Sequence, residues 1–431
     1  MINEAQSKGL RALFIRTAHS DFIYPLASLV IQLSVGLLFG HVYDQRISMA
    51  TGYLVATGNN PYIPQDLIGI FHNPAFQGMT SVGYPPPWPM LMGLIYLISY
   101  AVIPNLLLYN LAIKLPIIAA NLGLAYLVRR LLEERTGDTA LSHKAWTFLL
   151  FNPFLLYFTT AWGQFDSLVA LLTLLALALL DRQKDGPAAL LLALAISFKP
   201  ISIPVMLAAM VYLWGKPWLR LVRFLVILVA GGALFCIAPF ILFGWDASPV
   251  VQHWNAQFTV SGGMSLMTFY EQMRNTYLLP GRWWLLGLAW IPAVCVGSLL
   301  LLPSKHDFTD LLKKSLVLVL IFYLTRTWLS EPNLSLVLPM VLILTSLGEL
   351  PNFTLTMTWA LPLIFTIFNT SPPQLLFPIQ PDLMARLLQW MDVYRHARLE
   401  ARMVLVIPWQ ITGWWMVARG YRKGAPAVIA E

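Results

Sequence analysis

Charged residues are scarce in this sequence. They make up 11% of its 431 residues, while hydrophobic residues make up 58%. A soluble domain carries about a quarter charged residues, so the composition excludes an ordinary water-soluble fold. At ~20 residues for each membrane-spanning helix, the length allows about a dozen spans with their connecting loops. We therefore expect an all-α membrane protein that crosses the bilayer many times and has no separate soluble domain.

Cysteine is scarce as well. The two cysteines, Cys236 and Cys295, both fall inside apolar segments, which excludes a cysteine zinc site or redox pair and favours a packing role. The net charge of +8 does not indicate nucleic acid as a partner, because Lys and Arg lie in short clusters between apolar runs. No small-residue cleavage site follows the first apolar run, so we expect that run to stay as an anchor.

The apolar runs and the basic connections between them predict a topology. Apolar runs lie at about 23–40, 87–103, 106–128, 145–161, 167–181, 188–214, 219–243, 284–302, 315–329, 334–348, 354–369 and 401–418. The basic connections are the N-terminus, 129–144, 181–185, 216–223, 305–314 and 419–423. Basic connections lie on the cytoplasmic side. If every run crossed the membrane once, however, 129–144 would lie outside.

Two adjustments place every basic connection in the cytoplasm. First, we expect 87–103 to lie in the outer interface, because prolines precede it and Pro104 follows it. Second, we expect 188–214 to break at Lys199 and Pro200, since proline interrupts a helix and lysine is costly in lipid. About twelve crossings and one interfacial helix result, with both termini in the cytoplasm. The external loops are then 41–105, 162–167, 199–200, 244–283, 330–333 and 370–400.

This topology gathers unusual polar residues near the outer face. Asp44 directly follows the first apolar run, and the others are Lys114, Gln164, Asp166, Lys199, Arg326 and Glu331. Ionisable groups at membrane depth often mark a site or a pathway. The alternative is that these groups pair with one another and only hold the bundle together. Asp44 in that case caps a helix or pairs with Arg46.

The cluster has the two parts that sugar transfer from a polyprenyl phosphate requires. Cations hold a phosphodiester through charge-assisted hydrogen bonds, and arginine can form two in parallel. A nearby carboxylate can take the proton of an attacking hydroxyl. The cluster therefore favours a transferase that uses a lipid-phosphate sugar, with Asp44 as its base.

Five tracts of the sequence carry a resemblance to known enzymes. In chain order they read YDQRISMATGYLVATGNNPY, YPPPW, NPFLLYFTTAWGQFDSL, AISFKPISIP and WLSEPNLSLVLP. In this order they resemble tracts of the GT-C glycosyltransferases, the multi-span enzymes that use polyprenyl-phosphate sugars. The first tract is similar to a luminal loop of the GPI-pathway first mannosyltransferase and related microbial mannosyltransferases. The later tracts are similar to dolichyl-phosphate-glucose glucosyltransferases, and the resemblance spans roughly residues 20–350.

The resemblance implies a GT-C-like bundle of about 12 transmembrane helices. It implies a catalytic module over 1–350, and it leaves the role of the C-terminal helices and external loop of 351–431 open. The activity it implies is inverting hexose transfer, of mannose first and glucose next, at the extracytoplasmic face of an integral membrane protein. In a prokaryote the membrane would be the plasma membrane. The donor would be a polyprenyl-phosphate sugar, such as a dolichol phosphate, and the acceptor a lipid-linked glycan or similar molecule.

The resemblance also assigns roles to single residues. Asp44 matches the loop acid taken as the catalytic base, and Glu331 matches the acid of the late tract. The residues that we predict to contact substrate are Arg46, Tyr84, Lys114, Gln164, Asp166, Lys199, Arg326 and Glu331. Arg46 stands where the GPI-type enzyme has a second acid, so we expect no bound metal and no other cofactor. Ser330 replaces a histidine of the late tract, so a role that needs an imidazole does not carry over.

Two other classes of function remain open at this point. A lipid-linked-sugar transporter or flippase would need polar residues through the full membrane depth and often an internal repeat. The sequence has no such repeat, and its polar residues cluster on one side. A non-catalytic membrane scaffold needs no function for the acids, and composition alone does not exclude it.

Overall fold

Helices form almost all of the regular structure. The computed structural model describes residues 4–81, 83–302 and 307–421, with side chains from residue 21 onward. Within these residues the only strands are β1 (Gly262–Gly263) and β2 (Trp328–Leu329), which form one short parallel pair. The expectation of an all-α protein is thus confirmed in its main feature.

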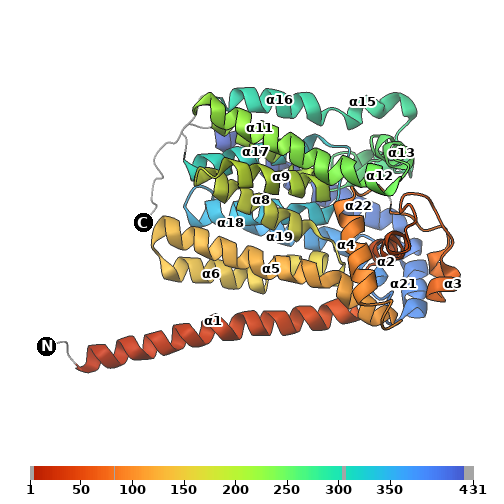
Figure 1. The fold of residues 1–431 in the computed structure, drawn as a ribbon, viewed down its shortest axis with the longest axis horizontal. Helices are drawn as coiled ribbons and strands as arrows, with labels where there is room; N and C mark the ends of the chain where they lie inside the picture. The colour runs from red at the N-terminus through yellow and green to blue at the C-terminus, as the bar shows by residue number, and fades with distance from the viewer. Residues whose placement is uncertain (1–3, 82, 303–306, 422–431) are drawn as a thin grey trace.

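The longer helices lie side by side along the longest axis of the molecule (Figure 1). The helices of this bundle include α1 (Glu4–Leu38), α5 (Leu106–Thr136), α6 (Thr139–Leu150), α8 (Asp166–Asp181), α9 (Asp185–Phe198), α11 (Trp218–Gly232), α16 (Trp290–Leu300), α17 (Phe308–Thr325), α18 (Val337–Ser346) and α19 (Asn352–Ile367). The core lies at α17 and α18, where nearly every side chain is buried.

The remaining elements are mostly shorter and include those that gather at one end of this bundle. They are α2 (Val42–Ala56), α3 (Ile68–Phe71), α4 (Pro87–Ile98), α7 (Pro153–Leu155), α10 (Ile203–Trp214), α12 (Ala238–Phe243), α13 (Ser248–Gln257), α14 (Thr268–Arg274), α15 (Trp284–Gly287), α20 (Ser371–Gln374), α21 (Pro381–Val393) and α22 (Arg395–Tyr421). Single turns of 3-10 helix lie at Pro74–Phe76, Pro200–Ser202, Gly281–Trp283 and Glu331–Ser335, and π-helical turns at Leu156–Ala161 and Ala233–Ile237.

Side-chain caps and one glycine explain where α5 begins and ends and where α6 begins. The Asn105 side chain accepts hydrogen bonds from the first free N–H groups of α5, and Asp138 does the same for α6. Between them Gly137 ends α5 with a φ of 66°, a backbone conformation that glycine adopts without steric cost. The connection predicted over 129–144 is therefore a tight helical hairpin, not a loop.

Several helices are long and apolar enough to cross a membrane. Within the described part of the chain these are Asp21–Leu38, Leu106–Thr136, Trp218–Phe243 and Gly281–Leu300. The pair Thr139–Ala161 and Asp166–Asp181 adds a fifth candidate, bent by 117°. The protein is an integral membrane protein. The predicted twelve crossings need spans that include the shorter apolar helices, so the count stays a prediction, as does the sidedness of the termini.

The break predicted in the run 188–214 is confirmed. α9 ends at Phe198, Lys199 has extended backbone with a ψ of 123°, and α10 begins at Ile203 after a 3-10 turn. Pro200 has no backbone N–H with which to continue α9. The break therefore leaves the Lys199 side chain at the end of a helix, where it can turn toward neighbouring elements.

The predicted external loop 41–105 begins with a helix. α2 packs closely against α4, and residues such as Met49, Ala50 and Leu54 are buried. The packing depends on Gly52, because a Cβ atom there would lie 2.7 Å from the carbonyl oxygen of Met92. The loop expectation was wrong for residues 42–56 because this tertiary contact has no local signal. α4 itself begins at Pro87 as expected and crosses the end of the bundle (Figure 1); its place at the membrane interface stays a prediction.

Candidate active site

Asp44 lies in the first turn of α2 and is held by two neighbours. The indole N–H of Trp162 donates to Oδ2 of Asp44 at 2.6 Å, and Nδ1 of His41 lies 3.1 Å from the same oxygen. Among the described residues, Oδ1 has no hydrogen-bond partner. Burial raises the pKa of Asp44, but the His41 and Trp162 side chains and the charge of Lys199 outweigh it and hold the pKa below its ordinary value. Asp44 is therefore ionised at neutral pH.

The turn after the π-helix Leu156–Ala161 brings Trp162 to α2. The backbone N–H of His41 and the side-chain amide of Gln45 both donate to the Trp162 carbonyl at 3.2 Å. Gly163 adopts a φ of +94°, and a Cβ there would lie 1.7 Å from Nε2 of Gln45. Only glycine fits this position. The glycine of the AWGQFD tract therefore allows the turn to approach α2 closely.

Lys199 and Asp166 form a buried ion pair beside this turn. The ammonium of Lys199 lies 2.9 and 2.8 Å from the two carboxylate oxygens of Asp166, and 3.4 Å from Oε1 of Gln164. The Asp166 side chain is fully buried and that of Lys199 is 14% exposed. Asp166 begins α8 in the tract NPFLLYFTTAWGQFDSL, and Lys199 follows α9 in the tract AISFKPISIP. Their ion pair joins these two tracts.

The YPPPW tract joins the same cluster through aromatic contacts. The ring of Trp88 stacks on Phe165 at 4.0 Å, and the ring of Tyr84 meets Phe165 edge-on at 5.2 Å. The Tyr84 hydroxyl lies within electrostatic range of both Asp44 and Asp166. Tyr84 is therefore near both the candidate base and the buried ion pair.

Arg326 has no acidic partner among the described residues. It directly follows α17, is half-buried, and its guanidinium lies over the Phe322 ring at 5.0 Å. Within the described residues it makes no ion pair and no hydrogen bond. Tyr323 lies within electrostatic range of both Arg326 and Asp166.

Glu331 begins the turn after β2 and is 3% exposed. Its Oε1 accepts a hydrogen bond from the Asn369 side chain at 3.2 Å, and Arg402 and His41 lie within electrostatic range. Arg402 is itself paired with Glu271 at 3.0 Å. The pairing of β1 with β2 fixes this turn. Gly263 in β1 has a φ of +61° and approaches Leu329 too closely for any Cβ.

Two predicted contact residues lie in different surroundings. Lys114 is fully buried, and its ammonium donates to the backbone carbonyls of Gly36, Phe39 and Ala161. It therefore ties the end of α1 to the π-helical turn. Arg46 donates to the carbonyl oxygens of Val42 and Ala75, which ties α2 to the 3-10 turn Pro74–Phe76. Both contacts favour structural roles, and neither residue enters the site that we propose below.

The structure adds three residues that our sequence analysis did not single out: His41, Asn369 and Arg402. His41, directly before α2, contacts Asp44. Asn369, which follows α19, donates to Glu331, and Arg402 of α22 lies within electrostatic range of Glu331. Among the described residues, no three His, Cys, Asp or Glu side chains are grouped closely enough to hold a metal ion. The absence of a metal requirement stays a prediction.

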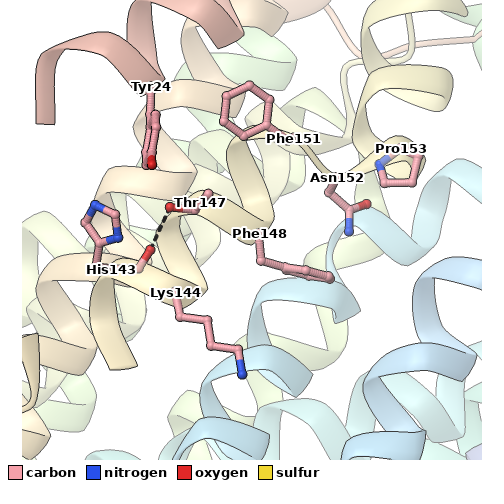
Figure 2. A pocket seen from close by; sticks show the side chains of 8 residues that line it. All are labelled: Tyr24, His143, Lys144, Thr147, Phe148, Phe151, Asn152 and Pro153. Carbon is pink, nitrogen blue, oxygen red and sulfur yellow. Dashed lines mark hydrogen bonds between the residues drawn. The ribbon is translucent and has the colours of Figure 1, made fainter. Parts of the chain in front are cut away.

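A separate pocket of about 430 Å³ lies where α1 meets α6 (Figure 2). Tyr24 of α1 faces His143 across it, and Lys144, Phe148 and Phe151 line the part along α6. Its lining contains none of the predicted site residues and no carboxylate. It therefore offers no counterpart to the Asp44 arrangement.

Comparison with known proteins supports a glycosyltransferase. No curated protein matches the chain. Among solved structures, that of ArnT from Cupriavidus metallidurans bound to undecaprenyl phosphate is similar to this chain with a TM-score of 0.47 and 13% identity, over 93% of this chain and 76% of that one. The model of glycosyltransferase family 87 matches residues 83–347. The matched range includes Tyr84, Asp166, Lys199, Arg326 and Glu331. This match confirms the resemblance to glycosyltransferases. The chain belongs to glycosyltransferase family 87.

Proposed function

We propose that this membrane glycosyltransferase moves a hexose from a polyprenyl-phosphate donor to a lipid-linked glycan or similar acceptor at the extracytoplasmic face. The observation that carries the proposal is a carboxylate with a free oxygen, Asp44, together with a guanidinium that has no ion-pair partner among the described residues, Arg326. Tyr84 interacts electrostatically with Asp44 and Asp166, and Tyr323 with Asp166 and Arg326. Sugar transfer from a lipid phosphate needs both parts, one for the proton and one for the leaving phosphate.

In the proposed reaction, Oδ1 of Asp44 takes the proton of the acceptor hydroxyl. The acceptor oxygen forms a bond to the anomeric carbon while the bond from that carbon to the phosphate oxygen breaks. The polyprenyl phosphate leaves with the bonding electrons, and Arg326 stabilises its charge. Attack opposite to the leaving group gives inversion. Asp44 is ionised before the reaction, so no preceding deprotonation is needed.

Lys199 has a less direct role in this proposal. Its charge is already neutralised by Asp166, so it gives a donor phosphate less than a free cation would. We expect Gln164 and Tyr84, beside this pair, to contact the sugar, and Glu331 to accept hydrogen bonds from sugar hydroxyls. The preference for mannose, with glucose second, rests only on the resemblance of the sequence tracts.

Purified protein incubated with radiolabelled polyprenyl-phosphate mannose or glucose and extracted lipid-linked glycans tests the proposal. We expect transfer from one of these donors, and a loss of about 10²–10⁴-fold in Asp44→Asn, which keeps the shape of the side chain but accepts no proton. The variant should still bind the donor, because a base that acts in the transition state affects turnover more than donor binding. Transfer from a nucleotide sugar instead, or near-normal turnover by Asp44→Asn, would refute the proposal.

A further inference from the structure

His41 has a place beside Asp44 that its neighbours define closely. Its ring stacks on Trp162 with centroids 4.2 Å apart and planes 13° from parallel, and the residue is 6% exposed. Its backbone N–H donates to the Trp162 carbonyl at 3.2 Å. The imidazole therefore cannot rotate away from Asp44 without losing the stacking contact.

His41 and Trp162 both contact the same oxygen of Asp44. Nε1 of Trp162 lies at 2.6 Å and Nδ1 of His41 at 3.1 Å from Oδ2. Trp162 holds Oδ2 by a hydrogen bond, and Nδ1 of His41 contacts the same oxygen without hydrogen-bond geometry, so Oδ1 is the oxygen left for another partner. A base must meet its substrate proton at hydrogen-bond distance, so fixing one oxygen aims the other.

His41 also lies within electrostatic range of the second acid of the site. Glu331 interacts with the charge of His41 and accepts a hydrogen bond from Asn369. The ionisable groups around this arrangement are Tyr43, Tyr84 and Lys199 near Asp44, and Arg402 near Glu331. The imidazole beside Asp44 is thus also part of the electrostatic surroundings of Glu331.

We propose that His41 is a positioning residue for the transfer reaction. Beside the Trp162 hydrogen bond, its imidazole keeps Oδ2 of Asp44 in place, so that Oδ1 faces the acceptor hydroxyl. This inference rests on the proposed function of Asp44 as base.

The test is the variant His41→Phe, which keeps an aromatic ring on Trp162 and removes both ring nitrogens. We expect kcat to fall about 10–100-fold while the donor KM changes less than about threefold. Since His41 lowers the pKa of Asp44, the acid limb of the pH profile should move to higher pH. Trp162→Phe, which removes the N–H donor and part of the ring that stacks on His41, should act in the same direction. The double variant should lose less than the product of the two single losses, because both changes act on one oxygen.

A matched control is available at the surface. His396 lies 3.1 Å from Glu400, and its side chain is 80% exposed. His396→Phe should leave kcat and the acid limb unchanged. Lower melting temperature for His41→Phe with unchanged kcat and acid limb would mean a purely structural role and would overturn the inference. Should His41→Phe not fold, unchanged kcat in Trp162→Phe would overturn it equally. Absence of transfer by the wild-type protein would instead refute the proposed function.

Discussion

Replacing Arg326 gives the sharpest test of the proposed donor site. Arg326 makes no ion pair with the described residues, and its one described contact is the stacking on Phe322 at 5.0 Å. Arg326→Ala therefore removes a cation without leaving an acid unpaired. Folding should change little, so any loss of activity reports the contact with substrate.

The magnitude follows from the kind of bond that is lost. A hydrogen bond to a charged group is worth ~1.5–3 kcal/mol, and each ~1.4 kcal/mol is tenfold in an equilibrium constant. We expect the donor KM or Kd to rise by about 10–150-fold in Arg326→Ala. Arg326→Lys keeps the charge but cannot form two parallel bonds, so its loss should be intermediate.

The assay is donor binding and transfer measured side by side on detergent-purified variants. A useful matched control is Arg46→Ala, since Arg46 donates to backbone carbonyls outside the Asp44 cluster. Donor KM within about twofold of wild type in Arg326→Ala would refute the assignment. Equal weakening by both alanine variants would indicate general loss of structure and not loss of a phosphate contact.

Three further predictions test other parts of the site and the topology. Lys199→Ala should destabilise the fold by about 3–5 kcal/mol, because it leaves the fully buried Asp166 unpaired. The double variant Lys199→Ala with Asp166→Asn should recover much of this loss. A thermal or denaturant melt measures both. The pKa of Asp44 is lowered, so its base form is lost only as pH falls through that lowered value. The acid limb of transfer due to Asp44 should therefore lie below ~pH 4, and a limb near pH 6 that disappears in Asp44→Asn would contradict this. Cysteines introduced at the exposed positions Gln77 and Thr136 test the topology. An impermeant thiol reagent on intact cells should label the first, which is expected outside, and not the second, which is expected in the cytoplasm. Equal labelling would refute the topology.

The sequence was informative where one local feature decides the structure. Pro200 cannot continue α9, so the break at Lys199 was predictable from two residues. The pairing of Lys199 with Asp166 followed less directly, from a topology that placed both at one face. The pair was also the alternative to substrate binding, and the structure favours that alternative for Lys199 more than for Arg326.

Tertiary contacts decided the rest. Lys114 was a plausible ligand for an anion, because a lysine inside an apolar run is costly in lipid. The structure satisfies it with backbone carbonyls freed at the end of α1 and at the π-helical turn. No local pattern tells a lysine that meets carbonyls from one that meets a ligand. His41 was missed for the same reason, since its role depends on Trp162, which lies 121 positions further along the chain.

The segment after residue 350 takes part in the site, although no sequence tract connected it with function. Glu331 is 3% exposed, and a buried carboxylate is costly without partners. Asn369, which donates to it, and Arg402, which lies within electrostatic range, both come from this segment. Arg402 is held by Glu271 of α14, which follows β1, and β1 pairs with β2 directly before Glu331. The late tract is therefore connected to β1, β1 leads into α14, α14 is paired with α22, and Arg402 of α22 lies near Glu331. The surroundings of Glu331 therefore need residues from both sides of position 350, and a boundary drawn there from sequence resemblance would divide the site.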